Sequence, residues 1–344
     1  MRNMNEFPVM NESLNRIYEQ SLSMISANAL AAGVKLCVFD NLREPVTVES
    51  LAKKQGLNPG ATQVLLDTLT SCGHLHKKDG MYRNMPDTDS FLVSSSPTYY
   101  GEILLREYQR NSISPDVIIE RVKSGPVPQS HTNDMCNEGF WERYARSMAN
   151  WERAGTAQML ASEISGLPEF QSFKTMLDLG GGPGLMSIAI LKNHPTMTGV
   201  VFDQPSVIPV TRQFIAEYGM DNRMSTQGGN YLEESFGSGY DLILCSCTLN
   251  FAKYCMDTMV ERIYDALNPG GIFVSLHDGM NEEGTYPRVH VLNMMTSALS
   301  GFSCSLEKGF IADAMKNAGF SSVTSKQVIM DVGPFELDIA RKDT

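Results

Sequence analysis

The sequence predicts an α/β protein, in which a doubly wound, mostly parallel sheet follows an N-terminal domain of helices with a winged-helix pattern. Three observations support this fold class. After residue 172, short apolar strand patterns alternate with helical patterns, as in sheets covered by helices on both faces. One strand, residues 175–179, runs through a glycine cluster into a helix. Carboxylates, Asp178 and Asp203, end two consecutive strand patterns.

The composition excludes several classes of protein. A chain of 344 residues is long enough for about two domains. Its formal net charge of −11 would repel nucleic acid. No apolar run approaches the roughly 20 residues of a membrane span, and the polar residues 1–6 do not begin a signal peptide. The seven cysteines have no framework spacing, so we expect reduced thiols and a cytoplasmic protein.

The first hundred residues predict a helical domain. Residues 11–42 give one long apolar helix, and residues 46–83 then read as helix, turn, helix and a two-stranded wing. The wing turns at Asp79-Gly80, a hairpin signal. The second helix of the pair, residues 61–72, contains no Lys or Arg. A DNA-recognition helix needs such cations, so DNA binding is not expected.

Residues 96–166 are again helical, with a break at residues 125–128. Trp141, Tyr144 and Met148 share one face of a helix in this segment. This face can either pack into a core or line a ligand pocket, and the sequence does not decide between the two.

The remaining chain supplies the strands of the sheet. Ligands of such sheets bind at the carboxyl ends of the strands. The expected strands are residues 175–179, 199–203, 224–227, 240–246, 271–277, 323–328 and 335–340. The polar residues expected at one rim are Asp178, Asp203, Asn230, Ser246, Asn250 and His277.

The glycine cluster, Asp-Leu-Gly-Gly-Gly-Pro-Gly at residues 178–184, predicts a close approach of the backbone to a cofactor at Gly180 and Gly182. No Lys follows the glycines, and Leu185 stands where a dinucleotide site has a third glycine or alanine. Asp203, at the tip of the next strand, is placed to accept from both ribose hydroxyls. These features favour an adenosine-containing cofactor without a pyrophosphate.

The glycine cluster, Phe-Asp-Gln-Pro at 202–205, Gly-Gly-Asn-Tyr at 228–231 and Asn-Pro-Gly-Gly at 268–271 follow one another in order. This pattern resembles the S-adenosylmethionine-dependent small-molecule O-methyltransferases, which include plant caffeate-type and bacterial polyketide and phenazine enzymes. The resemblance implies a Rossmann-like catalytic domain at residues 168–344, a winged-helix dimerisation domain at 1–105 and a helical linker at 106–167. It also implies a homodimer that methylates a small aromatic or heteroaromatic acceptor.

The same resemblance assigns candidate binding residues. Those implied for S-adenosylmethionine are Asp178, Gly180, Gly182, Asp203, Gln204, Asn230, Tyr231 and Ser246. Those implied for the acceptor are Trp141, Met148, Asn293 and Met294. Asn230 stands where the family has an Asp, and Ser246 where it often has a Lys, so the cofactor pocket loses a cation.

The catalytic position departs from the family. Asn250 occupies the position of the family's His base, and an amide cannot accept a proton near neutral pH. His277 occupies the position of the Glu that orients this base. We therefore expect His277, oriented by Asp278 or Asn250, to be a substitute general base. The alternative is that His277 only caps the end of a strand.

Other functions remain open at this stage. Loss of the base is compatible with methylation of carbon or nitrogen, for example on a tetrapyrrole, and with a protein that binds the cofactor without transferring methyl. Oxygen methylation of an aromatic or heteroaromatic hydroxyl is favoured. Thiolate metal binding by Cys245, Cys247 and Cys255 with His277 is not expected, because Cys-x-Cys on an apolar strand is more often buried filler.

Overall fold

The computed structural model describes residues 13–127, 138–302, 304–330 and 332–344. These residues form two compact units, which divide between Gln109 and Arg110. The part of the expected linker from residue 110 onward therefore belongs to the second unit. No helix among the described residues is long and apolar enough to span a membrane.

The first unit has the expected order of helices and wing. Its helices are α1 (Ser13–Lys35), α2 (Val48–Gln55), α3 (Pro59–Ser71), α4 (Pro86–Phe91) and most of α5 (Gly101–Asn111), whose last two residues belong to the second unit. A short 3-10 turn, η1 (Phe39–Asn41), follows α1. The wing is β2 (Leu75–Lys78) and β3 (Met81–Asn84), to which β1 (Val46–Thr47) adds a third antiparallel strand. Side chains of the α2 and α3 N-caps, Thr47 and Asn58, accept backbone N–H groups of the first turn.

The first helix is shorter than the sequence predicts, because the chain reverses after Lys35. Cys37 takes a left-handed conformation with φ of 52°, and the N–H of Val38 bonds to the carbonyl of Gly33. This is the hydrogen-bond pattern with which helices commonly end. An apolar pattern alone does not reveal such a reversal.

The second unit contains a seven-stranded sheet of order β6-β5-β4-β7-β8-β10-β9. The parallel strands are β4 (Thr175–Leu179), β5 (Thr198–Asp203), β6 (Met224–Gly228), β7 (Tyr240–Ser246) and β8 (Leu267–His277). The last two strands, β9 (Ser322–Met330) and β10 (Gly333–Arg341), are antiparallel to each other, and β10 is antiparallel to β8. The doubly wound, mostly parallel sheet is thus confirmed.

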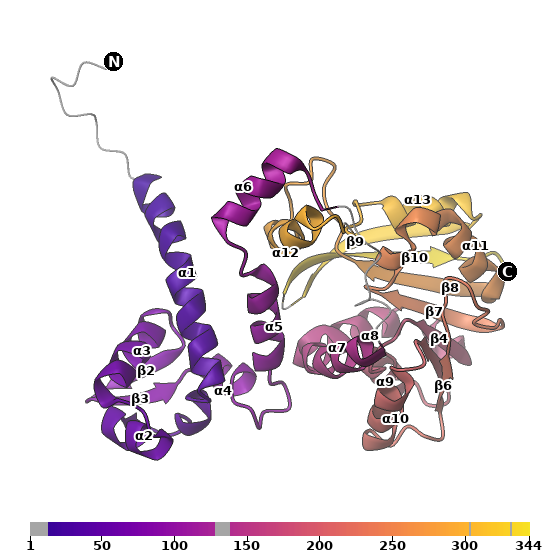
Figure 1. Cartoon of the computed structure of the whole chain (residues 1–344). Helices are drawn as coiled ribbons and strands as arrows, with labels where there is room; N and C mark the ends of the chain where they lie inside the picture. Colours follow the sequence, from indigo (N-terminus) through magenta and orange to yellow (C-terminus); the bar gives the residue numbers. More distant parts are fainter. Residues whose placement is uncertain (1–12, 128–137, 303, 331) are drawn as a thin grey trace. The chain divides into compact units, whose positions relative to one another are not determined.

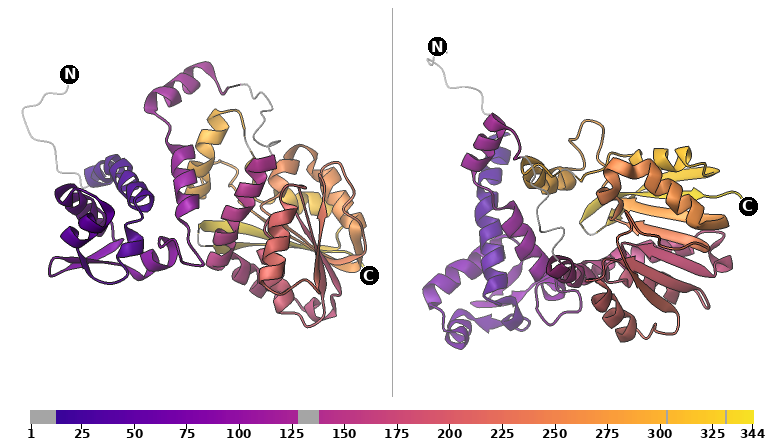
Figure 2. Two further views of the ribbon diagram at one scale, coloured as in Figure 1. Left: turned by 60° about the horizontal axis from the view of Figure 1, so that its bottom comes forward. Right: turned by 45° about the vertical axis from the view of Figure 1, so that its right-hand side comes forward.

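Helices cover both faces of this sheet (Figures 1 and 2). One face packs α8 (Ala157–Ser165), α9 (Leu185–Lys192) and α10 (Ile208–Glu217), and the other packs α11 (Met256–Ala266) and α13 (Phe310–Asn317). The other helical elements are α6 (Pro115–Ser124), α7 (Glu138–Trp151), π-helical η2 (Glu152–Thr156), η3 (Phe170–Ser172), η4 (Leu249–Cys255) and α12 (Arg288–Leu299). Alternate strand residues therefore enter one of two apolar cores.

Asp241 joins the first residues of three neighbouring strands. Its Oδ2 accepts the N–H groups of Lys174 and Thr175 at 2.7 and 3.1 Å, and its Oδ1 accepts from Asn268 Nδ2 at 2.8 Å. Burial raises the pKa of Asp241, but these hydrogen bonds outweigh that effect and leave the pKa below its usual value. The ionised carboxylate consequently stabilises the sheet at neutral pH.

We predict that Asp241→Ala lowers the free energy of unfolding at pH 7 by about 1–3 kcal/mol, because it leaves the N–H donors at the N-terminal ends of β4 and β8 without an acceptor. Since the pKa is lowered on folding, the difference from wild type should shrink as the pH falls through that pKa. Urea unfolding measures this. The exposed Asp313, paired with Lys316 on the surface, is the control, and Asp313→Ala should cost less than about 1 kcal/mol. Equal costs would contradict the role of Asp241.

Candidate active site

The buried carboxylate of Asp178 packs under the glycine loop between β4 and α9. Asp178 is 1% exposed, and its Oδ2 accepts a hydrogen bond from Ser187 on α9. Burial, and then the nearby Asp203, raise the pKa of Asp178 to about 7, although the Ser187 hydroxyl opposes the shift. Asp178 was expected at the rim, but its side chain is buried and points toward α9, so it supports the loop from beneath.

The backbone of the loop has the conformation that the glycines predict. Gly180, Gly182 and Gly184 have φ of 71°, 54° and 78°, in the left-handed region. A Cβ on Gly180 would lie 2.1 Å from Thr248 Oγ1, whereas a Cβ on Gly182 would meet no atom within 4 Å. Gly180 is therefore required for packing, and Gly182 faces open space in which a ligand can approach the backbone.

Asp203 lies beside this open position. Its Oδ2 accepts the N–H of Gly182 at 2.7 Å, and its Oδ1 accepts the N–H of Gln204 at 2.6 Å. Burial raises the pKa of Asp203 to about 6, against the effect of these two N–H groups. Each carboxylate oxygen can accept a further hydrogen bond, so the ionised side chain is suited to a ribose diol at the rim.

A second buried acid under the loop was not anticipated. Glu152 begins the π-helical turn after α7 and is 5% exposed. Burial, followed by repulsion from Asp178, raises the pKa of Glu152 well above its usual value, while backbone N–H groups of Met186 and Leu185 partly offset the shift. The signal available in the sequence was a lone acid just after an aromatic helix face, at Trp151-Glu152.

Two residues expected at the cofactor site have structural partners. Tyr231 is 8% exposed within the core on the α11 side, and its hydroxyl donates to the carbonyl of Thr248 at 2.8 Å. Asn230 accepts the N–H of Leu232 with its Oδ1 at 3.1 Å. Ser246 ends β7, and its buried Oγ has no hydrogen-bond partner among the described residues.

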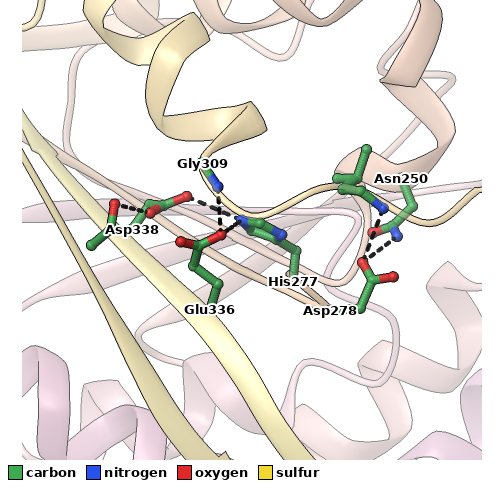
Figure 3. Close-up of polar contacts among 8 residues, drawn as sticks. Asn250, His277, Asp278, Gly309, Glu336 and Asp338 are labelled. Atoms are coloured by element: carbon green, nitrogen blue, oxygen red, sulfur yellow. Dashed lines mark hydrogen bonds and ion pairs between the residues drawn. The ribbon is translucent and has the colours of Figure 1, made fainter. Parts of the chain in front are cut away.

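Asn250 and Asp278 meet at the rim beyond β7 and β8 (Figure 3). Asn250 Nδ2 donates to Asp278 Oδ1 at 3.1 Å and to the carbonyl of Cys304 at 2.7 Å. Asp278 is 6% exposed, and its Oδ2 has no hydrogen-bond partner among the described residues. Asp278 Oδ2 is thus a buried carboxylate oxygen that can still accept a hydrogen bond.

His277 does not join this pair, which corrects the expected orientation by Asp278 or Asn250. Its Nε2 lies 3.1 Å from Asp338 Oδ2 and 3.5 Å from Glu336 Oε2, both on β10 (Figure 3). The reason is strand geometry. His277 shares a face with Phe273, which packs into the core on the α11 side, and the next residue, Asp278, lies at the rim.

The expected acceptor residues lie on two helices. On α7, the Trp141 ring packs edge-on against Phe251 at 5.6 Å between centroids, next to Asn250, and Met148 is half-buried on the same helix. On α12, Asn293 Oδ1 accepts a hydrogen bond from Arg110, and Met294 is half-buried. The Trp141 contact brings one expected pocket wall to the rim that holds Asn250 and Asp278.

The sheet order, the glycine loop and the acid at the tip of β5 define a class I S-adenosylmethionine-dependent methyltransferase, and comparison with known proteins agrees. Residues 130–321 match the model of the O-methyltransferase domain, and residues 18–94 match that of the O-methyltransferase dimerisation domain. The chain belongs to this O-methyltransferase family. It is a methyltransferase whose cofactor is S-adenosylmethionine and whose acceptor is a small molecule.

Named relatives differ in the atom that they methylate. N,N-dimethyltransferase OxyT of Streptomyces rimosus is 24% identical over 79% of this chain and 80% of its own length. The 3-hydroxy-5-methyl-1-naphthoate 3-O-methyltransferase of Streptomyces sahachiroi is 24% identical over 86% of each chain. The structure of human N-acetylserotonin methyltransferase in complex with S-adenosylmethionine has the same fold, with a TM-score of 0.77 at 21% identity, over 98% of this chain and 100% of that one.

We predict that Gly182→Ala weakens binding of S-adenosylmethionine by tenfold or more, because a methyl group would occupy the space open to the ligand, while stability falls by about 1–2 kcal/mol from the left-handed backbone. Gly219→Ala is the matched control, since its φ is 67° and its Cβ also meets nothing within 4 Å. Calorimetric titration and thermal unfolding measure the two effects. An equal loss of binding in both variants would refute the contact.

We predict that the affinity for S-adenosylmethionine falls as the pH drops below about 6, the pKa of Asp203, because the protonated carboxyl can no longer accept both ribose hydroxyls. The dissociation constant should rise about tenfold per pH unit there. Binding of S-adenosylmethionine to Asp203→Asn should be weak, and its dissociation constant should not rise further at low pH. A wild-type affinity that stays constant from about pH 5 to 7.5 would exclude this role for Asp203.

Proposed function

We propose that the protein methylates a hydroxyl group on a small aromatic or heteroaromatic molecule, with Asp278 as the general base and Asn250 as the residue that positions it. The observation that carries the proposal is the Asn250–Asp278 pair at the rim, with Asp278 Oδ2 buried and without a partner among the described residues. Asp278 would thus take the role of substitute base that we expected for His277, and Asn250 stands at the position of the family's His base.

The cofactor site fits S-adenosylmethionine. Gly182 would let the ligand approach the backbone, Asp203 would accept the ribose hydroxyls, and the free Ser246 hydroxyl would bind a polar group of the amino-acid part. When bound, S-adenosylmethionine supplies an electrophilic methyl group. Gln204, next to Asp203, and Asn230, just after the end of β6, are also proposed to bind the cofactor.

Asp278 would act on the acceptor hydroxyl. As the hydroxyl oxygen forms its bond to carbon, it loses electron density and its proton becomes more acidic, and this proton passes to Asp278 Oδ2. Asn250 donates a hydrogen bond to Asp278 Oδ1, and its second hydrogen bond, to the carbonyl of Cys304, fixes its own side chain. Burial of the carboxylate excludes competing water, so an acceptor that donates a hydrogen bond is aligned by it.

Trp141 and Met148 are proposed to form an apolar wall for the flat acceptor, and Asn293 and Met294 to contribute from α12. The edge-on packing of Trp141 against Phe251 would hold the indole in one orientation. The family's dimerisation domain supports a homodimer. The exposed apolar side chains of α1, which include Ile17, Met24 and Ile25, give such a dimer a surface to bury.

Methylation of an amine is the second candidate. The free Asp278 oxygen would accept a hydrogen bond from an amine N–H as readily as from a hydroxyl, and a relative of the chain is named an N,N-dimethyltransferase. The hydroxyl is favoured because a neutral amine attacks through its lone pair and does not need a base before the methyl group is transferred.

We predict that Asp278→Asn lowers kcat by 10²-fold or more, the usual contribution of a general base, while the affinity for S-adenosylmethionine changes less than about threefold. The acceptor would first be found by mass spectrometry of mixtures of hydroxylated aromatics and aromatic amines. Asp257→Asn, an exposed acid on α11, is the control and should retain wild-type turnover.

Two outcomes would count against this assignment. Turnover in Asp278→Asn above about half of wild type would remove Asp278 as the base. A product methylated on nitrogen, with no methylated hydroxyl from any acceptor, would replace oxygen methylation with the second candidate.

A further inference from the structure

We propose that His277, Glu336 and Asp338 form a binding site for a divalent transition-metal ion, with Zn²⁺ as the probe. The three side chains come from two strands and lie on the face covered by α11 and α13. His277 is opposite Glu336 in the antiparallel register, and Ser275 is opposite Asp338. Figure 3 shows the imidazole and both carboxylates directed at one another.

The spacing of the donor atoms suits a small metal ion. One donor atom from each residue lies within 4.8 Å of the other two, and His277 Nε2 is 3.1 and 3.5 Å from the two carboxylate oxygens. Zinc bonds of about 2.0–2.1 Å to nitrogen and oxygen place tetrahedral ligands roughly 3.3 Å apart. The two distances from His277 Nε2, 3.1 and 3.5 Å, lie just below and just above that ligand spacing.

The charge of the cluster also favours a cation. His277, Glu336 and Asp338 are 1%, 5% and 0% exposed, so two carboxylates are buried with one imidazole. Among the described residues, the positive charge of Lys308 also has an electrostatic effect on Glu336. Burial of an uncompensated carboxylate is costly, and a dication would offset the charge of both acids.

Neighbouring polar groups would complete such a site. Ser325 Oγ donates to Asp338 Oδ1 and so leaves Oδ2 directed at His277, and the N–H of Gly309 donates to Glu336 Oε2 at 2.8 Å. Ligands of metal sites are commonly held in this way by outer hydrogen bonds. Ser275 is 1% exposed on the same strand face as His277, and its Oγ has no partner among the described residues.

The donor set selects the class of metal. Imidazole with two carboxylates suits Zn²⁺, Mn²⁺ or Fe²⁺, whereas Mg²⁺ and Ca²⁺ prefer oxygen alone. The thiols considered from the sequence do not assemble: Cys245 packs into the core on the α11 side, whereas Cys247, with φ of 52°, packs against the opposite core. Within the described residues, His277, Glu336 and Asp338 are the group whose donor atoms meet.

The experiment measures metal content directly and does not depend on the methylation reaction. Full-length protein would be loaded with Zn²⁺, dialysed and analysed by plasma mass spectrometry. We expect about one Zn²⁺ per chain, and less than about a tenth in His277→Gln and Glu336→Gln. Glu169→Gln is the matched control, because Glu169 pairs with Arg341 at the far end of β10, and it should retain the metal.

Two further measurements keep the test decisive if a variant fails to fold. Ser325→Ala removes only the outer hydrogen bond to Asp338 and should weaken Zn²⁺ binding about tenfold in a competition titration. Co²⁺ bound in place of Zn²⁺ should show no thiolate charge-transfer band, which excludes the cysteines as ligands. The proposal is overturned if wild type retains no metal after dialysis, if Glu336→Gln or Ser325→Ala binds as tightly as wild type, or if the thiolate band appears.

Discussion

The hydrogen bond between Ser187 and the buried Asp178 is the contact on which the cofactor side of the molecule depends. It ties the first turn of α9 to the end of β4, and the glycine loop between them runs through left-handed conformations that leave open space at Gly182. Asp178 and Glu152 are buried under the loop and Asp203 lies beside it, and burial raises the pKa of each of these acids. A positive charge bound nearby would favour their ionised forms.

The acceptor side has a different arrangement from the one that the family resemblance implies. Asn250 stands where the family has an imidazole. The carboxylate of Asp278, just after β8, lies next to it and accepts a hydrogen bond from the Asn250 amide. The neighbouring residues His277 and Asp278, at the end of β8, therefore belong to two different polar clusters. Asp278 faces the rim, whereas His277 is buried under α13 with two acids from β10.

Much of the fold was predictable because it follows from local patterns. The alternation of strand and helix, the wing at Asp79-Gly80 and the glycine loop each depend on residues close in the chain. The long N-terminal helix was predicted past its true end, because the left-handed Cys37 has no compositional signal. The buried Glu152 and the acids of β10 were missed for a related reason: single acids in apolar segments do not reveal what covers them.

The sequence by itself determined the class of fold, the cofactor and the family, since each depends on motifs within a few residues and on the rule that parallel strands end at one edge. Only the tertiary structure decided which polar groups meet. His277 and Asp338 are 61 positions apart and come together because β10 inserts antiparallel beside β8. The direction of each side chain at a strand end depends on that pairing, so the partner of Asn250 and the burial of His277 are properties of the assembled sheet.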